Sequence, residues 1–150
     1  MSEIEPDAVE SALDALGVAW KKRGDGWAIP ATARTPCEIA IVTNDDELRI
    51  EGVLATWDVA GQTELAALAA MLRRAAADLP GVTFQVRPGR AVVAVHASDE
   101  RELAAAVSRV FTASRLLSRE AAALLEREMA DRYLAFFGAA AERPAPPARI

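Results

Sequence analysis

Residues 62–79, QTELAALAAMLRRAAADL, are the stretch around which we expect this chain to fold. The Pro80-Gly81 pair that follows is a typical helix stop. The apolar residues of the stretch recur three or four positions apart, which places them on one side of a helix. They are Leu65, Leu68, Leu72 and Leu79, with Ala69 and Ala76. Candidate strand pairs stand on both sides in the sequence, so this helix is the predicted spine against which a sheet packs.

Two hairpins are predicted before this helix. Residues 18–31 read VAWKKR–GDG–WAIPA, and Gly24 and Gly26 are expected to supply the backbone freedom of a tight turn. Residues 38–43 and 47–54 alternate apolar with polar side chains. This pattern is typical of antiparallel strands with one face in water.

A third hairpin is predicted after the helix. Residues 82–87 alternate, Pro88-Gly89 makes a turn, and residues 91–96 return. The return strand is apolar on both faces, Val92 included, which indicates an inner strand or an interface.

Helical patterns are found near both ends of the chain. Residues 6–16 form the first predicted helix. From residue 99 a second pattern continues to Gly138, and its register shifts at 112–118. One long helix and two helices both fit, with a break near 114–118 favoured. The predicted fold is α+β, an antiparallel sheet of about five strands with helices packed on it, in the order α-β-β-β(-β)-α-β-β-α(-α).

The length of 150 residues fits one domain. We place this domain at 1–138, with 118–138 as a C-terminal helical extension and 139–150 as a disordered tail rich in Pro and Ala.

The net charge and the cysteine content limit the partners and the cellular location that we expect. A net charge of −5 argues against nonspecific binding to nucleic acid or to an anionic membrane. The single cysteine gives no disulfide framework, and the acidic N-terminus lacks the basic start of a secretory signal. No apolar run is long enough to span a membrane. The cytoplasm is therefore the expected location.

Catalytic and metal-binding patterns are not found in the sequence. A nucleophile built from Cys37 and His96 would need spatial contact and a third orienting group, and nothing in the sequence places the two together. Spaced Cys/His pairs for zinc and glycine-rich phosphate loops are not found, and residues 44–47 read as a turn rather than a calcium loop. We therefore expect no enzyme activity, no cofactor and no metal.

Apolar residues remain as candidates for partner or dimer contacts, although such residues more often belong to the core. They are Trp57, Val92, Tyr133, Phe136 and Phe137. An alanine-rich helical end and a two-sided apolar strand offer more apolar surface than one small core requires, so self-association is a reasonable expectation.

The order of elements and several local stretches resemble a known family. The stretches are LDALG at 13–17, EIAIVTNDDELRIEGVLA at 38–55, LAALAAMLRRAAADL at 65–79 and PGVTFQVRPGRAVVAVHASDERELAAAVSRVFTAS at 80–114. They are similar to the class I type III secretion chaperone fold and to YbjN-like "sensory transduction regulator" domains. The resemblance implies a small, acidic, non-enzymatic protein, often a homodimer. In the chaperones, apolar patches hold an extended client segment by strand addition and helix-in-groove contacts.

The expected function is therefore a non-enzymatic binding or regulatory module with a protein or peptide partner. The alternative is a structural or regulatory domain that assembles through its C-terminal helices without holding a client. In that alternative, removing residues from 118 onward abolishes association and leaves a folded core.

Overall fold

The structure is a computed structural model that describes residues 4–32, 37–58 and 60–142, with side chains described as far as Leu125. The elements, in chain order, are α1 (Pro6–Ala15), β1 (Lys21–Arg23), β2 (Gly26–Ile29), β3 (Ile39–Asn44), β4 (Glu47–Thr56), α2 (Gln62–Asp78), β5 (Thr83–Arg87), β6 (Arg90–Ala97), the 3-10 turn η1 (Glu100–Glu102) and α3 (Leu103–Glu142).

The strands form one six-stranded antiparallel sheet in the order β1-β2-β3-β4-β6-β5. This confirms the predicted α+β class and all three hairpins. The sheet has six strands rather than about five, because the short segment Lys21–Arg23 pairs with β2. β6 lies between β4 and β5, which confirms the inner position predicted from its two apolar faces.

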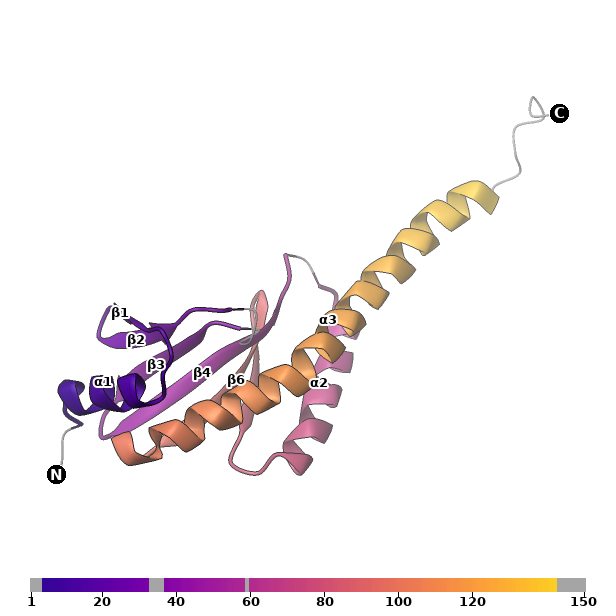
Figure 1. Cartoon of the computed structure of the whole chain (residues 1–150). Coiled ribbons are helices and arrows are strands. Elements are labelled where there is room, and N and C mark those ends of the chain that lie inside the picture. Colours follow the sequence, from indigo (N-terminus) through magenta and orange to yellow (C-terminus); the bar gives the residue numbers. More distant parts are fainter. Residues whose placement is uncertain (1–3, 33–36, 59, 143–150) are drawn as a thin grey trace.

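The helices lie on one face of the sheet, so the molecule has two layers (Figure 1). The alternation of buried and exposed side chains along β4 explains why the helices cover only one face. Leu48, Ile50 and Leu54 point to the helices and are buried, whereas Arg49 and Glu51 point to the opposite, open face. Trp27 of β2 is 2% exposed on the helix face, and its Nε1 donates to Glu10 Oε1 of α1 at 3.1 Å.

The spine of the molecule is α3, not the helix predicted for this role. α3 crosses β4 and β6 at the centre of the sheet, while α2 packs beside the edge strand β5 and against α3 (Figure 1). The buried stripe of α3 contains Leu103, Ala106, Val107, Val110, Ala113, Leu117, Ala121 and Leu125. That of α2 contains Leu68, Met71 and Leu72. The helix with the longer apolar stripe can cover more strands. The prediction for α2 depended instead on its place in the sequence between candidate strand pairs.

The break favoured near 114–118 is wrong, because α3 is continuous there. Ser114 is fully buried, and its hydroxyl has two partners. Its Oγ donates to Cys37 Sγ at 3.0 Å and lies 3.2 Å from Ser118 Oγ. Because these polar atoms are satisfied within the packing, the serines need not end the helix. α3 also continues past Gly138 to Glu142. Residues 143–150 of the predicted tail lie outside the described residues.

The two glycines of the first hairpin have different roles. Gly24 has φ +56°, as a tight turn requires, but Gly26 does not have a positive φ. A Cβ at Gly26 would instead overlap the backbone carbonyl oxygen of Ile41 on β3. Gly26 is therefore needed for close approach of two strands, and not for the turn freedom predicted from the sequence.

Within the described part of the chain, no helix has the length and apolar character needed to cross a membrane.

Candidate functional site

The structure places the two potential nucleophile partners on opposite faces of the sheet. Cys37 lies on the helix face, where its Sγ contacts Ser114 and lies near Gly52. His96 is opposite Arg49 in the β4–β6 register and lies on the open face, with its Nδ1 3.2 Å from Glu47 Oε2. The pair required for a Cys–His nucleophile is therefore not formed.

The thiol of Cys37 is held in its neutral form. Burial raises its pKa, and this effect outweighs the hydrogen bonds from Ser114 and from the Val53 backbone, which lower it. A thiol with a raised pKa in an apolar setting is a structural group rather than a nucleophile.

The predicted partner contacts fall in three different environments. Trp57 is half-buried and packs against the core, while its backbone N–H donates to the Gly89 carbonyl at 3.0 Å. Val92 is 1% exposed and points to the open face from β6. The side chains of Tyr133, Phe136 and Phe137 lie outside the described ones. The structure therefore does not bring these residues together in one described surface.

A groove of about 270 Å³ runs between α2 and the edge strand β5. Val86 is 38% exposed, and Phe84 is half-buried. The groove is lined by Ala69, Leu72, Arg73, Ala76, Phe84 and Val86. Sequence reasoning predicted both elements but could not see the groove, because it depends on β5 being the outermost strand.

Among the described residues, no strand pairs with the outer edge of β5. Arg87 and Arg90 flank the two-residue turn at Pro88-Gly89 and close the β5–β6 hairpin. Residues that close such a loop exchange both hydrogen bonds, and the pattern alternates along the strand. We therefore infer that the N–H groups of Phe84 and Val86 point away from β6, toward the free edge.

The opposite edge of the sheet differs in character. β1 reads KKR, and all three of its side chains are exposed. Lysine and arginine on an edge strand discourage pairing with another chain. The sheet thus has one charged edge, at β1, and one edge beside an apolar groove, at β5.

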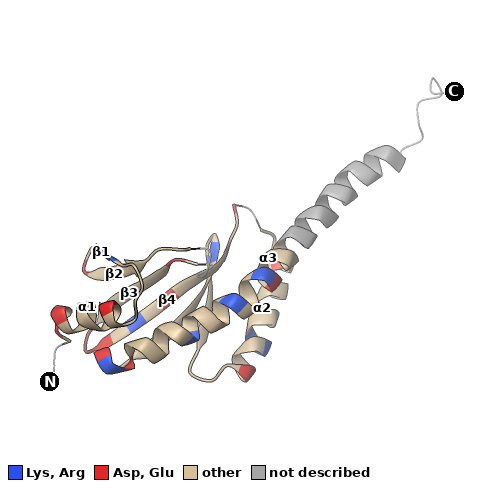
Figure 2. Cartoon of the chain, viewed as in Figure 1, with Lys and Arg blue, Asp and Glu red and all other residues tan. Residues whose placement is uncertain are grey.

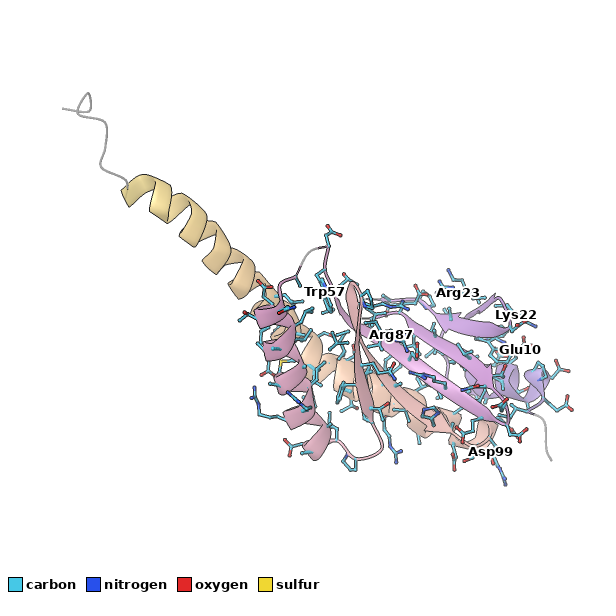
Figure 3. All side chains as sticks on the ribbon, turned by 180° about the vertical axis from the view of Figure 1, so that it is seen from behind. Glu10, Lys22, Arg23, Trp57, Arg87 and Asp99 are labelled. Carbon is cyan, nitrogen blue, oxygen red and sulfur yellow. The ribbon has the colours of Figure 1, made fainter. Side chains whose placement is uncertain are left out.

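The open face carries a polar network that spans β6 from β4 to β5. Glu51 Oε1 lies 2.6 Å from Arg49 Nε and 2.8 Å from an Arg87 guanidinium nitrogen. Gln85 Oε1 accepts from Arg49 at 3.2 Å and from Arg87 at 2.8 Å. Figure 3 looks onto this face, with Arg87 over the strands and Arg23 toward the β1 edge. Long side chains thus cover small residues such as Ala94, which is 1% exposed.

The network keeps Glu51 ionised. Burial by itself raises the pKa of this carboxyl, but the hydrogen bonds from Arg87 and the charges of Arg49, Arg87 and Arg90 outweigh it and hold the pKa below its ordinary value. A group whose folded-state pKa is lowered stabilises the fold above its unfolded pKa, and this stabilisation is lost as the pH falls through the folded-state pKa.

Replacing Glu51 by glutamine should therefore destabilise the protein at neutral pH and not in acid. We expect a loss of about 1–2 kcal/mol at pH 7, because two arginines lose their ionised partner. The difference from wild type should shrink below about pH 4, where glutamate in the unfolded chain is already protonated. Urea unfolding of both proteins from pH 7 to pH 3 measures this. A difference that stays constant over that range would contradict the assignment.

The described charged residues of α2 and α3 do not gather into one site. Figure 2 shows the charged residues of α2 and of the described part of α3 spread along the two helices, as on solvated helix faces. Among the described residues, no three His, Cys, Asp or Glu side chains converge as metal ligands would.

The protein is a two-layer α+β domain. One face of its sheet is open, and one edge strand, β5, lies beside an apolar groove. No family model and no curated protein matches the sequence. A solved structure does match: YbjN from E. coli, proposed to be a transcription regulator. The match has a TM-score of 0.53 and 16% sequence identity, and it covers 85% of this chain and 93% of YbjN. The chain therefore has a YbjN-like fold, which confirms the YbjN-like part of the resemblance at the level of fold.

Proposed function

We propose that this protein is a non-enzymatic binding module that takes an extended segment of a protein partner along β5. The segment adds a strand to the sheet, and its apolar side chains enter the groove between α2 and β5. The observation that carries the proposal is an edge strand directly beside an apolar groove.

The contrast between the two edges supports this choice. Three exposed cationic side chains on β1 discourage pairing with another strand, whereas β5 has Phe84 and Val86 on its groove side. Backbone pairing would supply affinity, and the groove would select alternate side chains of the segment. The separation of Cys37 from His96 supports a binding role rather than nucleophilic catalysis.

The partner we expect carries acidic residues next to apolar ones. Arg73 lines the groove and makes no ion pair among the described side chains. An acidic residue of the segment would supply the missing counter-charge. A second copy of this chain pairing β5 with β5 is the competing occupant, and it gives a homodimer.

Selection of displayed random octapeptides on the wild-type protein, followed by fluorescence anisotropy, tests the proposal. We expect Val86→Lys to weaken binding of selected peptides about tenfold or more, because it places a charge at the groove. Val42→Lys is the matched control, since Val42 is 44% exposed on β3, away from the groove. It should bind within about twofold of wild type.

Two outcomes would overturn the proposal. One is equal loss of binding in both variants. The other is a concentration-dependent dimer, seen by light scattering, that Val86→Lys dissolves, together with no peptide that binds at this edge. The second outcome assigns the β5 edge to self-association.

A further inference from the structure

A second hollow lies on the open face of the sheet, away from the β5 groove. It has a volume of about 270 Å³. Its floor is formed by Ala40, Val53 and Val92, from β3, β4 and β6. Its rim is formed by Arg23, Glu38, Glu51 and Arg90. β4 shifts register between Val53 and Ala55, beside this floor, and such irregularities bend a strand locally.

The rim has one arginine whose charge is not paired. Glu38 forms an ion pair with Arg23, and Glu51 forms ion pairs with Arg49 and Arg87. Arg90 is exposed, and its guanidinium makes no hydrogen bond or ion pair with any described residue. Arg90 acts on Glu51 only through its charge. Its guanidinium donors are therefore available to a ligand.

The charge around the hollow is opposite in sign to that of the whole chain. The hollow itself is lined by two arginines, at 23 and 90, and two glutamates, at 38 and 51. Arg49 and Arg87, which form ion pairs with Glu51, add two positive charges beside it. The complete chain has a net charge of −5. A local positive site on an acidic protein concentrates anions there.

From this arrangement we propose that the open-face hollow binds a small organic anion. Arg90 holds its carboxylate or phosphate group in a charge-assisted hydrogen bond. A short apolar part rests on Ala40 and Val53, next to the buried Val92. Drug-sized ligand sites measure about 300–1,000 Å³. The hollow is slightly smaller, at about 270 Å³, which limits the apolar part to a short chain.

Methyl NMR of valine-labelled protein tests this directly, because Val53 and Val92 lie on the floor. The probes are hexanoate, hexylamine and inorganic phosphate. We expect hexanoate to shift the Val53 and Val92 methyl signals and hexylamine to leave them unchanged. Arg90→Gln should weaken hexanoate binding about tenfold. Arg119→Gln, which removes an exposed arginine of α3, should bind as wild type does.

Three results would overturn the proposal. They are equal shifts with hexylamine, hexanoate binding to Arg90→Gln within about twofold of wild type, and no shift of either methyl at saturating hexanoate. Phosphate binding as tightly as hexanoate would overturn the role of the apolar floor. Should Arg90→Gln lose its native spectrum, Val53→Ile narrows the floor instead and should weaken hexanoate binding. Unchanged binding to that variant counts against the site.

Discussion

Replacing Gly26 by alanine is expected to lower the free energy of unfolding by about 3 kcal/mol, at the upper end for overpacking. The added Cβ would overlap the Ile41 carbonyl oxygen and lie 3.2 Å from the carbonyl carbon and 3.4 Å from the Val42 Cα. All three atoms belong to the backbone of β3, so no side chain can rotate away. Relief requires β2 to move from β3, which disturbs the buried neighbour Trp27.

Gly24→Ala is the matched control, two positions away in the same hairpin. Gly24 has φ +56°, but no atom lies within 4 Å of the place that a Cβ would occupy there. Alanine at this position should cost about 1 kcal/mol, from the left-handed conformation alone. Urea unfolding followed by tryptophan fluorescence measures both variants. Equal losses at the two positions would show that Gly26 is kept for turn conformation after all.

Ending the chain after Leu117 is expected to cost about 3 kcal/mol of stability relative to ending it after Leu125. Ala121 is fully buried, and Leu125 is 8% exposed. Both continue the apolar stripe of α3, so they belong to the core and not to a separable extension. The first part of the helical extension predicted at 118–138 therefore packs on the domain.

The two truncations also separate the functions considered for the C-terminal helix. Thermal unfolding and light scattering of residues 1–117, 1–125 and the full chain give stability and mass together. Association present in the full chain and lost in 1–125, with stability kept, would favour assembly through the end of α3. Association kept in 1–125 would place the contact on the domain, where β5 lies. Equal stability of 1–117 and 1–125 would contradict the assignment of Ala121 and Leu125 to the core.

Local periodicity in the sequence was enough to predict the elements and their order. Alternation of Leu48 and Ile50 with Arg49 and Glu51 follows from the period of two along a strand, and it correctly predicted one dry and one wet face. The apolar faces of β6 predicted its inner position. The spacing of Leu68 and Leu72 predicted α2. Each of these depends on neighbours within a few residues.

Only the tertiary structure decided which helix spans the sheet, which strand is outermost and why Gly26 is glycine. These depend on contacts between residues far apart in the chain, such as Ser114 with Cys37 and Gly26 with Ile41. The two candidate sites also depend on contacts between residues far apart in the chain. The β5 groove exists because α2 lies beside the last strand, and the open-face hollow joins residues from β1, β3, β4 and β6. Periodicity shows which face of an element is buried, but not which element will cover it.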